Sequence, residues 1–171
     1  MNTSSLKLKL VIAALALTAF VGSVFAGGLK AGDTVPDLSK FKLEGNVPDL
    51  KDKVVLIDFW ASWCGPCKKS FPVMKDLLDK FSARGFTILA ISVDEKKSDM
   101  ESFLKKNPVP FTTVRDADGK TPEAFGAQTM PTSFLVGADG KIITVHSGFD
   151  GEATHKKYLA EIEAALKAAG K

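Results

Sequence analysis

The chain is 171 residues long and 45% hydrophobic, which is enough for one domain built around a single core. Its formal charge is +3, but residues 1–26 hold two of the 23 basic residues and no acidic one, so 21 basic residues face 20 acidic ones in the rest. A chain this close to charge balance, with no basic cluster, is not expected to bind nucleic acid.

Residues 1–26 have the pattern of a signal peptide. Lys7 and Lys9 form a positively charged start, an apolar stretch follows, and Val24 and Ala26 are the small residues that precede a cleavage point. The apolar stretch is shorter than the roughly 20 residues that span a bilayer, and an uncleaved membrane anchor is the alternative. Either way we expect residues 27–171 to form a bacterial domain that is periplasmic or otherwise extracytoplasmic. Disulfide bonds persist in such a compartment.

The next residues predict an N-terminal extension and then the centre of an α/β fold. Residues 29–50 contain many turn residues, and we expect them to cover a sheet edge, with a small hairpin around residues 44–46. The apolar run 54–60 predicts a buried strand. Residues 65–84 have the apolar spacing of a helix, and the apolar run 86–93 predicts a second, parallel strand reached by a right-handed crossover.

The rest of the chain predicts a longer insertion, a hairpin and a closing helix. The capping box of Ser98 and Glu101 predicts a helix that starts at Ser98. The predicted elements are, in order, a helix at 98–106, a strand at 111–114, a turn at 116–119, a short helix from 121, strands at 133–136 and 141–146 around a turn at 138–140, and an amphipathic helix at 152–168.

The two cysteines of the chain, Cys64 and Cys67, lie where the first strand meets the first helix. The unpaired N–H groups and the positive dipole end of a helix stabilise a thiolate, and Pro66 is tolerated in the first turn. A structural bridge over so short a loop would add little stability, and zinc would lack ligands because His146 and His155 lie far along the chain. We therefore expect a pair that cycles between dithiol and disulfide, with no metal and no further cofactor.

The segment VVLIDFWASWCGPCK resembles the active-site segment of the thioredoxin family. Asp58 stands at the family's buried acid, Pro72 at its helix-kinking proline, and Thr129 to Thr132 at the loop whose proline, Pro131, is cis. The leader, the N-terminal extension and the insertion are similar to those of the TlpA-like (ResA-like) branch, which are extracytoplasmic thiol–disulfide oxidoreductases. The resemblance implies an α/β thioredoxin-like fold: a central mixed β-sheet flanked by helices, with an N-terminal extension and a helix–strand insertion.

Position and resemblance together suggest roles for the site residues. Cys64 is the expected nucleophile and Cys67 the resolving thiol. From the strand pattern alone, Asp58 is either a proton acceptor with a raised pKa or a carboxylate that accepts from backbone donors, and the resemblance favours the proton acceptor. Residues expected to contact substrate are Trp63, Gly65, Pro66, Met130, Pro131 and Gly148.

The leading functional hypothesis is a monomeric reductase of protein disulfides, with an apocytochrome c or a copper-site assembly protein as the candidate substrate. A membrane-bound or other thiol reductant would recycle it. Gly65 and Pro66 bring neither charge nor a side-chain donor to the thiolate, which favours a reductant. The alternatives are a dithiol oxidase of the same fold and a non-enzymatic carrier that binds copper(I) through both thiolates.

Overall fold

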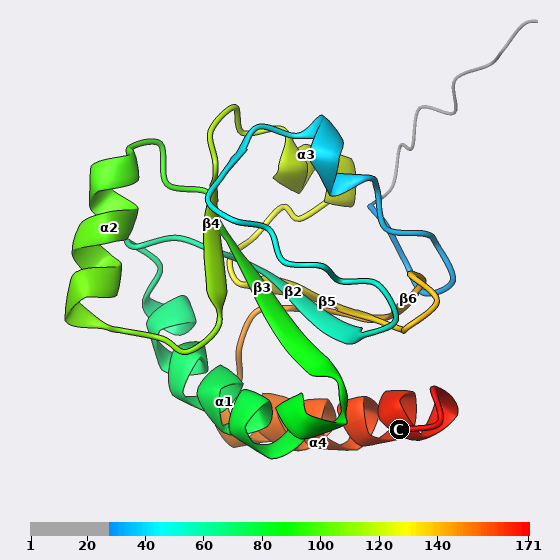
Figure 1. The fold of residues 1–171 in the computed structure, drawn as a ribbon. Coiled ribbons are helices and arrows are strands. Elements are labelled where there is room, and N and C mark those ends of the chain that lie inside the picture. Colours follow the sequence, from blue (N-terminus) through cyan, green and yellow to red (C-terminus); the bar gives the residue numbers. More distant parts are fainter. Residues whose placement is uncertain (1–27) are drawn as a thin grey trace, which may run out of the picture.

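The computed structural model describes residues 28–171 (Figure 1). The predicted signal peptide lies outside the described residues, so its cleavage after Ala26 stays a prediction. Within residues 28–171, no helix has the length and apolar character needed to cross a membrane.

A six-stranded mixed sheet in the order β1-β4-β3-β2-β5-β6 forms the centre of the described structure. β2 is parallel to β3, and β3 to β4, whereas the pairs β2–β5, β5–β6 and β1–β4 are antiparallel. The expected α/β, thioredoxin-like architecture is confirmed. The strands are β1 Leu43–Glu44, β2 Val54–Trp60, β3 Phe86–Ser92, β4 Thr112–Asp116, β5 Thr132–Val136 and β6 Ile142–Ser147.

Helices cover both faces of the sheet. In Figure 1, α1 and α4 lie together under one face, and α3 and the N-terminal extension lie over the other. The bounds of the helices are α1 Gly65–Phe81, α2 Lys97–Lys106, α3 Thr121–Phe125 and α4 Gly151–Ala168, with single 3-10 turns at Leu38–Lys40 and Ser82–Arg84.

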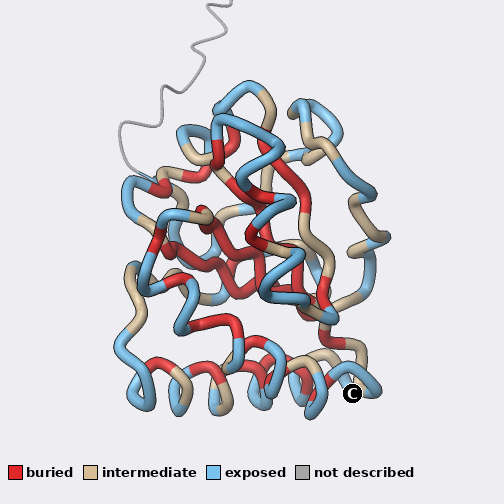
Figure 2. Tube along the Cα trace, turned by 90° about the vertical axis from the view of Figure 1, so that its left-hand side faces the viewer, coloured by how far each residue is buried: buried red, intermediate tan, exposed pale blue. Residues whose placement is uncertain are grey.

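The central strand β2 is buried along its whole length, so its alternate side chains enter two separate cores. Figure 2 shows buried residues, in red, gathered in the interior of the molecule. Leu56 and Trp60 pack toward α1, α2 and α4, in the same cluster as both cysteines. Ile57 and Phe59 pack toward α3 and the extension. Burial on both faces holds the end of β2, and with it the start of α1, in a fixed position.

The N-terminal extension covers a sheet edge as expected, but the predicted hairpin at residues 44–46 is wrong. Leu43 and Glu44 pair instead with Asp116 and Arg115 of β4. The unpaired edge of β4 satisfies the backbone of this short segment, so the chain has no need to fold back on itself.

The predicted capping box is also wrong, because α2 begins at Lys97 and no side chain caps it. The carbonyl of Lys96 accepts from the N–H of Asp99 at 3.1 Å, which places Ser98 inside the first turn. The other boundaries are confirmed to within one or two residues, except that the end of the predicted 65–84 helix forms a separate 3-10 turn, stopped by the left-handed Gly85.

Candidate active site

The dithiol lies at the carboxyl end of β2, where Cys64 is the N-cap of α1. Cys64 and Cys67 form a disulfide, with their Cα atoms 5.3 Å apart. The backbone N–H of Cys67 donates to Cys64 Sγ at 3.2 Å. The same donor, at the positive end of the helix dipole, can stabilise the Cys64 thiolate once the pair is reduced.

The two sulfurs differ in access to solvent. Cys67 is 0% exposed, whereas Cys64 retains 4% exposure. The chain neighbours of Cys64 are exposed: Gly65, Pro66 and Trp63, which is 70% exposed. These three predicted contact residues thus lie beside Cys64, the less deeply buried of the two cysteines.

Asp94 fixes the loop that precedes Cys64, a role that the sequence reasoning missed. Its buried carboxylate accepts from the backbone N–H of Ser62 at 3.0 and 3.1 Å, from Ser62 Oγ at 2.8 Å and from Ser92 Oγ at 2.8 Å. Charge-assisted hydrogen bonds of this kind hold a loop more firmly than neutral ones. Asp94 follows the strand parallel to β2, so both strands end at the same edge, and this position was the only available signal.

Asp58 lies inside β2, 1% exposed, and burial raises its pKa well above the usual range for an aspartate. Its Oδ2 has no hydrogen-bond partner among the described residues. The alternative reading, a carboxylate that accepts from backbone donors, is therefore not what the structure shows at this oxygen. A carboxyl group in this environment favours its neutral form and holds a proton near neutral pH more readily than an exposed one.

A buried polar pair lies beside Asp58. Asp58 is paired across the sheet with Ser133 of β5, whose Oγ is 2.6 Å from the Tyr158 hydroxyl of α4. Burial, and then the charge of Asp58, raise the pKa of Tyr158. Next along the same row, His146 of β6 is paired with Ser133 and bonds to Glu161 through Nε2 at 2.7 Å. Asp58, Ser133 and His146 are thus neighbours across β2, β5 and β6, and the last two bond to Tyr158 and Glu161 of α4.

The predicted loop residues Met130, Pro131 and Gly148 are also brought together. The Met130–Pro131 peptide is cis. The N–H of Gly148 donates to the Pro131 carbonyl at 2.7 Å, and Met130 packs against the core cluster that contains both cysteines. Among residues 28–171, neither the N–H nor the carbonyl of Met130 has a backbone partner, so both can pair with an extended segment.

The comparisons with known proteins agree with this geometry. The Redoxin family model matches residues 30–162. The chain belongs to the Redoxin family. It is 34% identical over 157 residues to the thiol–disulfide oxidoreductase ResA of Bacillus subtilis (strain 168), covering 89% of this chain and 87% of that protein.

Two further relatives extend the match. The ResA of Geobacillus thermodenitrificans (strain NG80-2) is 30% identical over 167 residues, covering 92% of this chain and 96% of that one. A crystal structure from Chlorobium tepidum, proposed to be a thiol:disulfide interchange protein DsbE, is 41% identical with a TM-score of 0.75. It covers 81% of this chain and 99% of that chain. The Redoxin-family protein described here is a thiol–disulfide oxidoreductase.

The arrangement offers this oxidoreductase thiol chemistry at Cys64 and Cys67. No group of three or more histidine, cysteine or acidic residues that could hold a metal occurs in the described part of the chain. The two histidines are engaged apart from the dithiol, His146 with Glu161 and His155 with Asp76 at 3.0 Å. The Cys64–Cys67 pair itself can exchange disulfides with a substrate disulfide.

Proposed function

We propose that this protein reduces protein disulfides outside the cytoplasm, with Cys64 as the nucleophile. The observation that carries the proposal is the asymmetry of the two sulfurs. Cys64 is the N-cap at the helix start and keeps 4% exposure, whereas Cys67, one turn further into the helix, is 0% exposed. A substrate sulfur can thus approach only Cys64, and only Cys67 is placed to attack Cys64 from within.

In the reduced protein, the Cys64 thiolate attacks one sulfur of the substrate disulfide. The substrate S–S bond breaks, a mixed disulfide forms, and the departing substrate thiolate takes up a proton. Cys67 then loses its proton to the ionised form of Asp58 and attacks Cys64 Sγ. Asp58 returns this proton to the departing substrate sulfur. This second exchange releases the other substrate thiol and restores the Cys64–Cys67 disulfide, so two electrons pass to the substrate and no cofactor is needed. A thiol reductant must then return two electrons to the protein.

The reducing direction is supported by what surrounds Cys64. Gly65 and Pro66 are exposed and contribute neither charge nor a side-chain donor to Cys64. Besides the helix dipole, the Cys67 N–H is the contact that stabilises a thiolate at Cys64. Moderate thiolate stabilisation makes the disulfide form comparatively hard to reduce, which suits a reductant. The dithiol oxidase is the alternative direction for the same site.

The extracytoplasmic location is supported by the signal-peptide pattern of residues 1–26. The substrates that we propose are protein disulfides, approached as extended segments along Trp63 and Met130. The protein works as a monomer and is recycled by a thiol reductant.

Trapping tests the assignment of the two cysteines. Cys67→Ser, incubated with a peptide disulfide, should accumulate a mixed disulfide on Cys64 that a non-reducing gel and intact mass detect. The matched variant Cys64→Ser should form no adduct and reduce nothing. If adducts instead accumulate on Cys67 in the Cys64→Ser protein, the proposed order of attack is wrong.

A further inference from the structure

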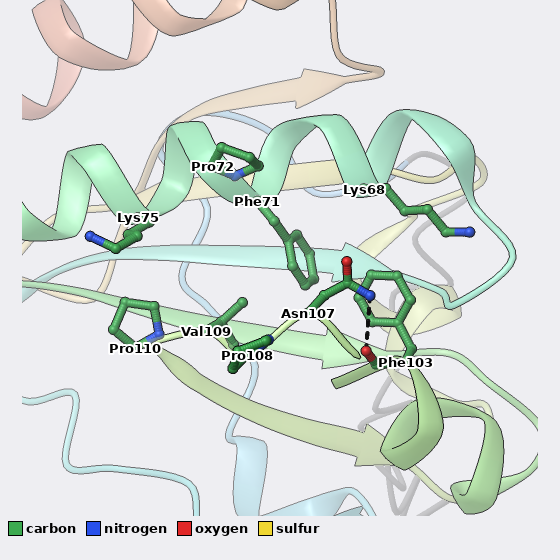
Figure 3. Close-up of a pocket in the computed structure, with 9 residues that line it drawn as sticks. All are labelled: Lys68, Phe71, Pro72, Lys75, Phe103, Asn107, Pro108, Val109 and Pro110. Carbon is green, nitrogen blue, oxygen red and sulfur yellow. Dashed lines mark hydrogen bonds between the residues drawn. The ribbon is translucent and has the colours of Figure 1, made fainter. Parts of the chain in front are cut away.

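A groove lies between α1 and the segment that follows α2. Phe71 of α1 and Phe103 of α2 form its floor, and Pro108, Val109 and Pro110 form the opposite wall (Figure 3). Its volume of about 260 Å³ is below the roughly 300 Å³ of typical small-molecule sites. The groove therefore has room for one or two side chains of a bound segment.

The wall of the groove is preformed. Asn107 closes α2 with two contacts to the Phe103 carbonyl, from its backbone N–H at 2.9 Å and from Nδ2 at 3.0 Å. The two prolines that follow restrict the backbone further. Because the wall is already ordered, a segment that binds there has to order only itself.

Lysines and no acidic residue line this groove. Lys68 and Lys75 project from α1 on either side of Phe71 (Figure 3). The Lys68 ammonium lies 5.7 Å from the centre of the Phe103 ring, and Lys75 forms an exposed ion pair with Asp79 that a carboxylate from outside can exchange. An apolar floor between two cations is complementary to an apolar side chain with an acidic neighbour.

The groove is continuous with the active site. Cys64, Lys68, Phe71 and Lys75 follow the spacing i, i+4, i+7 and i+11, which places them along one side of α1. A second hollow, lined by Ser62, Lys68, Asp99 and Lys106 among others, shares Lys68, Phe103 and Asn107 with the groove and reaches the loop before Cys64. A polypeptide bound at Cys64 can therefore continue directly into the groove.

We propose that this groove is a docking site for an acidic, extended segment of the protein substrate, an inference that rests on the proposed function. At a helix rise of about 1.5 Å per residue, Phe71 lies about 10 Å and Lys75 about 16 Å along α1 from Cys64. An extended chain covers about 3.3 Å per residue. The preferred substrate thus carries an apolar residue about three positions from its reactive cysteine and an acidic residue about five positions from it.

Two disulfide-linked peptide dimers test the proposal. Both have phenylalanine three residues after the cysteine, and they differ only in having glutamate or lysine two residues further on. At low salt the glutamate peptide should be reduced with a kcat/KM about fivefold higher, since each exposed ion pair contributes a factor of about 1.4 to 5. The preference for the glutamate peptide should fall in 0.5 M salt, because salt screens exposed charges. The Debye length shrinks to about 3 Å at 1 M salt.

Reversing the charge of the groove lysines tests whether they cause the preference for the glutamate peptide. The double variant Lys68→Glu/Lys75→Glu should prefer the lysine peptide, whereas Lys157→Glu, an exposed lysine on α4, should keep the preference for the glutamate peptide. Equal rates for both peptides, or the same loss of preference in Lys157→Glu, would overturn the docking site. Reduction of neither peptide would contradict the proposed function itself, so the two failures are distinguishable.

Discussion

Replacing Asp58 by asparagine should stabilise the oxidised protein by an amount that grows with pH. Asp58 is 1% exposed, its Oδ2 has no partner among the described residues, and burial raises its pKa. In the unfolded chain the pKa of an aspartate is about 3.9. The folded protein therefore holds the Asp58 proton at pH values where the unfolded chain has already released it, and rising pH favours the unfolded chain.

The size of the effect follows from proton linkage. Above about pH 4 the wild-type protein should lose stability relative to Asp58→Asn by up to about 1.4 kcal/mol per pH unit. The loss should stop once the pH exceeds the folded-state pKa, because both states are then ionised. The oxidised form is the right one to study, since Cys64 and Cys67 form a disulfide there and do not titrate.

Urea unfolding at intervals between pH 4 and pH 8 measures this difference. The control is Asp58→Ala, which also removes the titrating group but leaves a smaller side chain. The altered packing should lower the stability of Asp58→Ala by the same amount at every pH. The pH dependence of its stability relative to wild type should therefore match that of Asp58→Asn. A stability difference that does not change with pH in either variant would refute the raised pKa, and with it the basis for Asp58 as the proton acceptor.

The remaining predictions concern Asp94, the Ser133–Tyr158 pair and the signal peptide. Asp94→Ala should lower the free energy of unfolding by about 3 kcal/mol, since it removes charge-assisted bonds to Ser62; an unchanged urea midpoint would contradict this. Tyr158→Phe and Ser133→Ala should each cost about 1–3 kcal/mol, because each leaves a buried hydroxyl unpaired. The double variant should cost no more than either single one, and strictly additive losses would show that the two hydroxyls do not act as a pair. Intact-mass analysis of protein from the native host should show cleavage after Ala26, and a mass that retains residues 1–26 would identify an anchor.

The parts of the fold that depend on local pattern could be predicted. The apolar run 54–60 and the periodic helix after it are strong local signals, and they place the dithiol at the strand–helix junction where the structure has it. Burial of Asp58 followed from its position in that run. These features depend on neighbours in sequence, whose arrangement is set by the periodicity of strand and helix.

Long-range pairing accounts for what was missed. Glu44 meets Arg115 only because the sheet leaves the edge of β4 open, and nothing near residue 44 distinguishes that outcome from a hairpin. The contact between Asp94 and Ser62 likewise needs two parallel strands to end at one edge. The groove beside α1 depends on how residues 107–110 pass Phe71, which is a matter of tertiary packing.

The reduction potential of the Cys64–Cys67 pair tests the reductase function most directly. Equilibration with glutathione or dithiothreitol buffers, followed through the fluorescence of Trp60 and Trp63, measures it. Thioredoxin, which has the same Gly-Pro dipeptide, has a potential of about −270 mV, and a strong oxidant of its superfamily about −120 mV. We expect a value below about −220 mV, because Gly65 and Pro66 add no charge that would stabilise the thiolate. A value near the oxidant's would contradict the reductase function and favour the dithiol oxidase.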